Sequence, residues 1–428
     1  MKQPLNPIDE VFLSQGRDPG PILGQFIRFR GNPPSLDVLH KHLADRLPDL
    51  SRLTHRPVTD QGRMFRTPSP DFDLRDHLAE RELPAGTSLD EALTAVVRHP
   101  LPRDGPPWSL ELVHGYETGE YAVCYRVHHA LEDGLGAVHV VATLFGDGPQ
   151  TVSARKGEQP IGPFPSCERG GPLFPAGASE LLRGTLSVST LLARGLLPVR
   201  PWPRAPRPDA AQLATCSVSA TRQELGTLGR KFGGTVNDAF LMALRGALAD
   251  WSTEGKARDI RSVFQASPVP VRMPLSTRDV GEGEAVGNHL ATAVVTLPAR
   301  EATSALAFGQ LVENTHRMRS NGLRPASRVL VRLLPSAVTR WTVRRLLNPR
   351  AAPLYASSYT LPNSLSLHGD PVVDVVPLGV LLPGNALSVT LLSCGSRVRV
   401  SFLYDRRVPG AERLAVLWRG ALDELLLL

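Results

Sequence analysis

The eight residues VHHALEDG, at positions 127–134, combine two histidines, two carboxylates and a glycine where the secondary structure is predicted to change. The chain before them has the pattern of a strand, and the apolar spacing of residues 135–145 predicts a helix after them. Because side chains alternate between the two faces of a strand, His128 and His129 are not expected to act as a matched pair. One should face a potential cleft while the other packs or supports it. Asp133 could fix the loop through an arginine or orient an imidazole tautomer.

This cluster has other interpretations. Paired histidines at a strand end are most often packed structural residues. A metal site is a second interpretation, but a catalytic zinc needs three protein ligands, and His139 on the following helix lacks a motif spacing. A serine hydrolase is disfavoured because the sequence has no G-x-S-x-G motif. The spacing H-H-x-x-x-D-G is expected by chance only about once in several hundred chains of this composition, which favours a functional role. Gly134 would then remove a side chain where a substrate passes.

Outward from the cluster, the chain divides into three parts. Residues 1–145 alternate strand-like and helix-like patterns. Residues 146–212 are rich in glycine and proline and contain one amphipathic helical pattern at 179–197, which indicates a crossover linker. Residues 213–428 again mix both patterns. The sequence therefore predicts two α/β domains joined by a linker.

Individual elements can be predicted inside both domains. Leucines at helical spacing predict a helix over residues 35–47 with Ser35 as its N-cap, and Thr235 is placed to cap a helix that ends near residue 251. Strand patterns separated by turn residues predict two hairpins. The expected strands are 24–29, 262–275 and 290–297, and the expected hairpins are 110–115 with 121–129 and 387–392 with 397–404.

Composition limits the class of protein. The 428 residues are 42% hydrophobic and 21% charged, which suits two ordinary domains. A formal net charge of +7 is modest for this length, so no nucleic-acid partner is expected. The four cysteines lack C-x-x-C spacing and are expected to be reduced thiols. With no secretory signal and no apolar run of about 18 residues, a cytoplasmic protein is expected, with attachment to a membrane surface as a further option.

Residues 128–134 match the signature of the chloramphenicol acetyltransferase and nonribosomal condensation-domain superfamily. The rest of the sequence most resembles its wax ester synthase/diacylglycerol acyltransferase branch, over nearly the whole chain. Outside the H-H-x-x-x-D-G motif, the order of the landmarks is more specific than any one of them. These landmarks are PLNPID at 4–9 followed by Phe12-Leu13, FDLRDHL at 72–78, PAG at 84–86, PPW at 106–108, GTVND at 234–238, PVR at 270–272 and GN at 287–288.

The sequence departs from this branch at two places. The branch carries a late segment similar to Ser-Asn-Val-Pro-Gly-Pro, whose counterpart here is SSYTLP at 357–362, without the asparagine and the glycine. Pro107 stands in the middle of a motif that is Pro-Leu-Trp in the branch. Both changes weaken the expectation of the usual lipid acceptor more than they weaken the expectation of the fold.

The resemblance implies two chloramphenicol-acetyltransferase-like domains with mixed sheets and flanking helices, and an active site at the domain interface. It implies an O-acyltransferase that moves an acyl group from acyl-CoA to a hydroxyl acceptor, either a fatty alcohol or diacylglycerol, without a covalent acyl-enzyme. By this resemblance His129 is the general base, His128 supports it and Asp133 holds the loop. No metal, and no cofactor other than acyl-CoA as co-substrate, is expected.

The resemblance also implies substrate-binding residues. Gly134 would leave space for substrate, and Asn237 and Asn288 are candidate donors to the oxyanion of the reaction. For Asn237 and Asp238, capping of the helix that begins behind Thr235 is an equally good interpretation.

Two other functions remain open at this stage. A natural-product tailoring enzyme would keep the chemistry but acylate another hydroxyl or amine, with acyl-CoA or an acyl carrier protein as donor, and the altered late segment favours this version. A non-catalytic docking module would keep only the fold. The intact His129, Asp133 and Gly134 argue against the docking module, because a protein that only binds needs no base in a cleft.

An arginine-rich segment is a further feature of the sequence that does not depend on the family resemblance. Residues 314–369 contain nine arginines, all between 317 and 350, and no aspartate or glutamate. Apolar residues alternate with these arginines, which predicts basic amphipathic helices. An anionic membrane surface, the phosphates of coenzyme A and an acidic acyl carrier protein are all suitable partners. A solvated helix face is the simpler alternative.

Overall fold

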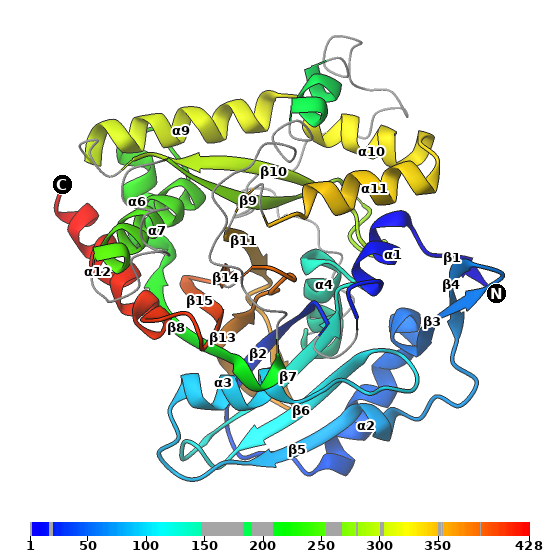
Figure 1. The fold of residues 1–428 in the computed structure, drawn as a ribbon. Coiled ribbons are helices and arrows are strands. Elements are labelled where there is room, and N and C mark those ends of the chain that lie inside the picture. The colour runs from blue at the N-terminus through cyan, green and yellow to red at the C-terminus, as the bar shows by residue number, and fades with distance from the viewer. Residues whose placement is uncertain are drawn as a thin grey trace.

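The computed structural model has two six-stranded sheets and one three-stranded sheet among its described residues, with helices packed around them (Figure 1). The described residues are 2–16, 20–146, 183–190, 209–253, 268–279, 281–299, 304–349, 352, 354–385 and 387–428. This mixed α/β architecture is the fold class that the sequence predicts.

The first large sheet has the strand order β12-β13-β2-β7-β6-β5. Strand β7 (Glu120–His128) pairs antiparallel with both β2 (Ile22–Arg30) and β6 (Trp108–His114). Both faces of β7 are buried, because one packs toward α4 (Gly134–Phe145) and the other toward α3 (Leu89–Arg98). The remaining elements of this half are β1 (Gln3–Pro4), α1 (Pro7–Leu13), α2 (Leu36–Arg46), β3 (His55–Asp60), β4 (Arg63–Pro68), β5 (Leu78–Glu82) and 3-10 helices at Leu47–Thr54 and Leu74–His77.

The second large sheet has the order β10-β9-β11-β14-β15-β8. Helices α7 (Val236–Thr253), α9 (Ser304–Ser320) and α12 (Leu414–Leu427) share one hydrophobic cluster with its strands, and they cover one face of the sheet (Figure 1). Its strands are β8 (Leu213–Thr221), β9 (Val269–Ser276), β10 (Leu290–Leu297), β11 (Leu354–Leu361), β14 (Leu387–Cys394) and β15 (Arg397–Asp405). The other helices of this half are α6 (Arg222–Lys231), α10 (Leu323–Leu333), α11 (Ser336–Leu346) and a 3-10 helix at Ala411–Arg413.

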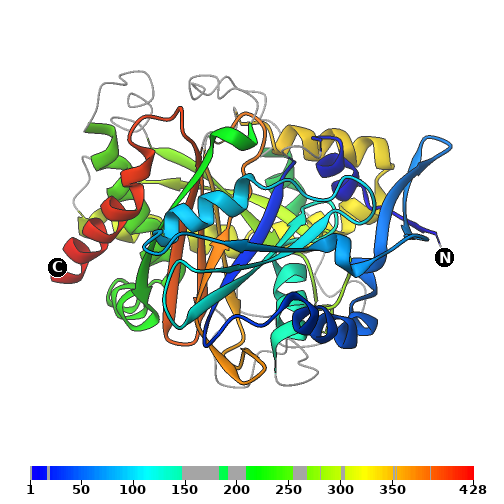
Figure 2. The ribbon, with the colours of Figure 1, turned by 90° about the horizontal axis from the view of Figure 1, so that it is seen from below.

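The two halves are not separate bodies. Strands β12 (Ser366–Leu367) and β13 (Asp370–Leu378) come from the second half of the chain but complete the first sheet, where β13 pairs antiparallel with β2. Figure 2 shows β13, in orange, beside β2, in dark blue. This differs from the sequence division, in which residues 213–428 form one domain, because the alternation of a strand does not specify which sheet it joins.

Local predictions agree with the structure where it describes them. Both hairpins are confirmed as β6–β7 and β14–β15, and Ser35 caps α2 as predicted. The arginine-rich segment forms the three helices α9, α10 and α11. Of the linker helix predicted at 179–197, residues 183–190 are helical, and the rest lies outside the described residues. No helix among the described residues is long and apolar enough to cross a membrane.

Candidate active site

His128 is the last residue of β7, and its imidazole is fully buried. Its Nδ1 accepts the backbone N–H of Ala130 at 3.1 Å, and its Nε2 lies 3.0 Å from the carbonyl oxygen of Gly16. Because Nδ1 accepts, the proton belongs on Nε2, which donates to Gly16. A Cβ on Gly20 would lie 2.7 Å from the ring, so the packing around it is tight. His128 is therefore engaged on both nitrogens within the first half of the chain.

His129 follows the strand and differs in its surroundings. Its backbone N–H donates to the carbonyl of Pro21 at 2.7 Å, and its ring stacks on Phe12 of α1 with centroids 4.1 Å apart. The side chain keeps 3% of its surface exposed, and Nδ1 has no hydrogen-bond partner among the described residues. Burial lowers the pKa of His129, so the imidazole is neutral at pH 7. A neutral imidazole is what a general base requires.

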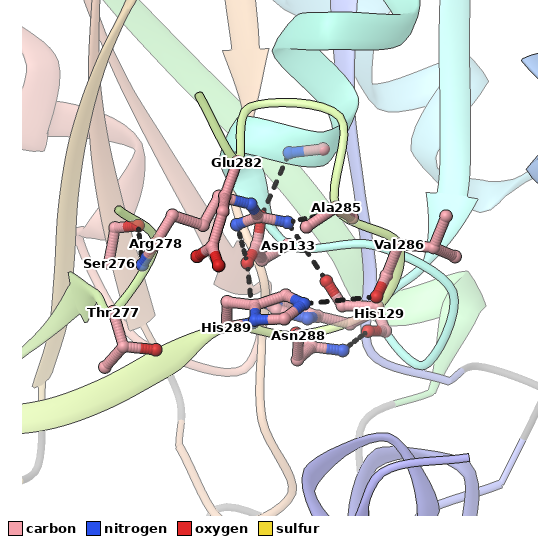
Figure 3. A network of polar contacts seen from close by, with 12 residues as sticks. His129, Asp133, Ser276, Thr277, Arg278, Glu282, Ala285, Val286, Asn288 and His289 are labelled. Carbon is pink, nitrogen blue, oxygen red and sulfur yellow. Dashed lines mark hydrogen bonds and ion pairs between the residues drawn. The ribbon is translucent and has the colours of Figure 1, made fainter. Parts of the chain in front are cut away.

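Asp133 joins this loop to the second half of the chain. Its carboxylate caps α4 by accepting the N–H of Gly136 at 2.9 Å, accepts the N–H of His289 at 3.0 Å and forms an ion pair with Arg278 (Figure 3). Burial opposes its ionisation, but the Arg278 charge and these hydrogen bonds hold the pKa of Asp133 below its ordinary value. Arg278 also donates to the carbonyls of Ala285 and Gly287 at 3.0 and 3.1 Å. The carboxylate thus holds the loop through an arginine.

Asn288 lies beside His129 but uses its amide differently from the sequence expectation. Its Nδ2 donates to the backbone carbonyl of His129 at 2.5 Å (Figure 3). The same Nδ2 donates to Asp9 of α1 at 2.7 Å, and the backbone N–H of Asn288 also donates to Asp9. Both amide hydrogens are therefore used, which leaves Asn288 without a free donor for an oxyanion. Gly287 must be glycine, because its φ is 88° and a Cβ would lie 2.6 Å from Asp9.

Asn237 lies on α7, and its Oδ1 accepts the hydroxyl of Ser358 on β11 at 3.0 Å. That contact joins the predicted Asn-Asp landmark to the altered segment 357–362, and no described contact joins Asn237 to the 128–134 loop. Its neighbour Asp238 accepts from Thr235 at the start of α7 and pairs with Arg319 of α9 at 3.0 Å. The capping interpretation therefore holds for Asp238.

Gly134 begins α4 beside β11. A Cβ at this position would lie 3.8 Å from the ring of Tyr359, which is ordinary van der Waals contact. The structure therefore gives no close steric reason for glycine here.

Several buried charges around the loop were not identified from the sequence. Glu132 is fully buried, and burial raises its pKa against the attraction of Arg52 and Arg66. Arg66 donates to the carbonyl of Leu131 at 3.0 Å, and burial raises the pKa of Asp9 to about 7. A buried aspartate in the loop requires a cation, but nothing in an arginine-rich sequence indicates which arginine supplies it. Among the described residues, no group of three His, Cys, Asp or Glu side chains could hold a metal ion.

Comparisons with known proteins identify the family of the chain. The family model for the wax ester synthase/diacylglycerol acyltransferase catalytic domain matches residues 5–278, and that for the WS/DGAT C-terminal domain matches residues 286–426. The chain belongs to the wax ester synthase/diacylglycerol acyltransferase family. It is therefore an acyltransferase of the WS/DGAT family.

Curated relatives and solved structures cover most of this WS/DGAT chain. A probable diacylglycerol O-acyltransferase of Mycobacterium tuberculosis is 23% identical over 420 residues, which are 90% of this chain and 86% of the relative. The wax ester synthase/diacylglycerol acyltransferase of Marinobacter aquaeolei has a TM-score of 0.66 at 18% identity and covers 99% of both chains. A mutant starter condensation domain of rhizomide synthetase, solved with C8-CoA, has a TM-score of 0.62 at 16% identity and covers 100% of this chain and 95% of that domain. These structures share the fold.

Proposed function

We propose that this chain transfers an acyl group from acyl-CoA to the hydroxyl of a fatty alcohol or diacylglycerol, with His129 as general base. The neutral His129 ring carries the proposal, because it stands where the first half of the chain meets the loop that contains Asn288. The names of the mycobacterial relatives support a diacylglycerol acceptor. The condensation domain solved with C8-CoA supports an acyl-CoA donor.

The proposed reaction needs one base and a positioned donor. His129 takes the proton of the acceptor hydroxyl as its oxygen attacks the thioester carbonyl, and the tetrahedral intermediate then expels the coenzyme A thiolate. The protonated imidazole returns its proton to that sulfur, so no acyl-enzyme forms. General-base catalysis of this kind is worth about 10²–10⁴-fold. His128 and Asp133 act through the loop: the first packs its strand end, and the second fixes it to Arg278.

A tailoring role is the second candidate function. The hydroxyl of Ser358 bonds to Asn237, so the segment that departs from the family pattern contacts a predicted substrate-binding residue. This favours an acceptor other than a neutral lipid, with acyl-CoA or an acyl carrier protein as donor.

Release of free thiol tests both candidates. Purified protein is incubated with acyl-CoA and either a long-chain alcohol, diacylglycerol or a small polar acceptor. Thiol release with the first two acceptors supports the leading function, and release with only the polar acceptor or a carrier-bound donor supports the tailoring role. Absence of thiol with every pair would contradict both.

We also propose that α10 and α11 bind an anionic membrane surface. Most arginines here already have partners: Arg328 pairs with Glu282 at 2.7 Å, and Arg340 pairs with Glu10 of α1 at 2.6 Å. The exposed Arg332 and Arg344 instead stand near exposed apolar side chains. These are Leu333 (74% exposed), Val338 (43%) and Trp341 (54%). Exposed basic and apolar groups on two consecutive helices suit anionic lipid, and α11 packs on α1, which carries Phe12.

Vesicle flotation tests this surface. Arg332→Ser/Arg344→Ser and Leu333→Ser/Trp341→Ser should each reduce binding to phosphatidylglycerol vesicles. Arg63→Ser/Arg75→Ser removes the same charge from an exposed part of the first half, away from α10 and α11, and should not reduce this binding. Equal binding by all three variants, or binding that does not differ from that to phosphatidylcholine vesicles, would contradict a lipid surface. Loss of acyl-CoA or carrier-protein binding alone would assign the arginines to those partners.

A further inference from the structure

Arg272 of β9 is a buried cation with few partners. Its side chain is fully buried, and its Nη2 donates to the backbone carbonyl of Asn348 at 2.7 Å. Its Nε and Nη1 are buried without any hydrogen-bond partner among the described residues. Burial lowers the pKa of Arg272 to about 10, so the guanidinium is still charged at neutral pH. An uncompensated buried charge is strongly destabilising, so a buried guanidinium of this kind is expected to bind an anionic group.

Three of the other four buried arginines in the described chain have a carboxylate close by, whereas Arg52 donates to the backbone carbonyl of Glu284 at 2.6 Å. Arg278 pairs with Asp133, Arg126 lies 3.7 Å from Glu111, and Arg66 lies 3.8 Å from Asp9. Each of them therefore has a carboxylate within 4 Å. For Arg272 the described residues offer no ion pair.

Arg272 lies on the face of its sheet that is turned toward the candidate active site. Val271 and Met273 point into the hydrophobic cluster that includes α7 and α9, so alternation turns Arg272 to the opposite face of the sheet. Tyr355, the register neighbour of Arg272 on β11, belongs to the hydrophobic cluster that also contains Ala130 and Leu131 of the loop. Arg272 therefore shares the face of β9 that looks toward the 128–134 loop.

Polar groups continue across the sheet from Arg272. In register it is beside Tyr355 of β11, which is beside Ser388 of β14. The hydroxyl of Ser388 is also buried without a partner among the described residues. Tyr355 belongs to the hydrophobic cluster of the first half, so this row lies between the two sheets. Pro274, two residues along β9, and Val294, the neighbour of Arg272 on the edge strand β10, are only half-buried, so this face is not completely packed.

We propose that Arg272 binds an anionic group, a carboxylate or a phosphate, on the acyl acceptor. The inference rests on the proposed acyl transfer and favours its second candidate function, because fatty alcohols and diacylglycerol carry no negative charge, whereas the acceptor inferred here is a hydroxylated molecule with an anionic group. A carboxylate or phosphate would accept from Nε and Nη1 together, as guanidinium geometry favours. The phosphates of coenzyme A are the other source of such a group, but they belong to a bulky nucleotide at the far end of the donor from its thioester, which suits a fully buried arginine less well.

A binding measurement that needs no turnover tests the site first. The probes are 12-hydroxystearate, its methyl ester and 1-octadecanol, and the readout is the shift in Tm of the full chain. Hydroxystearate should raise the Tm of the unaltered protein more than the two neutral probes, and Arg272→Met should abolish this difference. Without ligand, Arg272→Met should have an unchanged or higher Tm, because it removes an unpaired buried charge. A lower Tm together with an equal response to all three probes would overturn the proposal.

Turnover then locates the anion. The ratio of kcat/KM for hydroxystearate to that for its methyl ester should fall by about tenfold or more in Arg272→Met, and Arg272→Lys should recover part of it. Arg126→Met, at a buried arginine beside Glu111, is the matched control and should leave this ratio unchanged. If Arg272→Met instead lowers kcat/KM only with acyl-CoA as donor and leaves it unchanged with an acyl N-acetylcysteamine thioester, the anion belongs to the donor. The acceptor assignment is then wrong. A probe-dependent Tm shift without turnover would reject the acyl transfer but retain the anion site.

Discussion

At the end of β7, His128 and His129 are held by different parts of the chain. On one side, His128 is enclosed by the first half, with one ring nitrogen bonded to Ala130 and the other to Gly16. On the other side, His129 meets the second half through Asn288 and keeps a ring nitrogen without a partner. Two identical side chains, one residue apart, are thus given different tasks by their hydrogen bonds. A histidine with both nitrogens engaged positions the backbone, whereas one with a free nitrogen can accept a proton.

His129→Ala should give the largest effect on catalysis. Removal of the base should lower kcat by about 10²–10⁴-fold, and release of thiol from acyl-CoA measures it. Because the ring is buried against Phe12, the Tm should also fall, and activity is measured at a temperature where the variant is folded. His139→Ala, at another buried histidine on α4, is the matched control and should keep most of the activity. Turnover equal to that of the unaltered protein would exclude His129 as the base.

Asp133→Asn should give the largest effect on stability. It leaves the Arg278 guanidinium buried without its counter-charge, which should cost about 3–5 kcal/mol in the free energy of unfolding. Urea denaturation measures it. The double variant Asp133→Asn/Arg278→Met should be more stable than Asp133→Asn alone, because the uncompensated charge is gone. Equal stability of the single and double variants would show that the ion pair does not hold the loop.

His128→Phe tests the other side of the strand end. The ring shape is kept, but the N–H of Ala130 and the carbonyl of Gly16 lose their partner, so the free energy of unfolding should fall by about 1–3 kcal/mol. Activity should fall much less than in His129→Ala. A larger loss of kcat than of stability would move the catalytic role from His129 to His128.

The sequence predicts the local part of this site but not its long-range part. Strand alternation and helical spacing place the turn correctly, since β7 ends at His128 and α4 begins at Gly134. These patterns report which residues share a face over a few positions. They carry no information on partners far away in the chain, so the pairing of Asp133 with Arg278 was open until the fold was known.

The same limit explains the two differences from expectation. Asn288 was predicted to donate to an oxyanion from its place after Gly287, but its amide bonds to Asp9, 279 positions earlier in the chain. Strand β13 has an ordinary strand pattern, yet it pairs with β2 in the sheet of the other half. In both cases tertiary structure decides the role, and the residue type alone is compatible with several.

The smallest expected effect is a difference between the pH dependence of activity, which reports on His129, and that of stability, which reports on Asp133. Burial lowers the pKa of His129, so the base stays neutral below about pH 6.5, the ordinary histidine value, and kcat/KM should fall only as the pH drops through the lowered pKa. The pKa of Asp133 is also lowered, so its stabilisation is complete above about pH 3.9 and is lost only as the pH falls through that lower pKa. Activity should therefore decline only below about pH 6.5, and the loop should lose its anchor only below about pH 3.9. Parallel measurement of kcat/KM and of unfolding by tryptophan fluorescence from pH 8 to 3 tests both limits. An acidic limb of kcat/KM at or above the ordinary histidine value would contradict a buried neutral base, whereas a limb that coincides with unfolding would assign the loss to the loop instead of the imidazole.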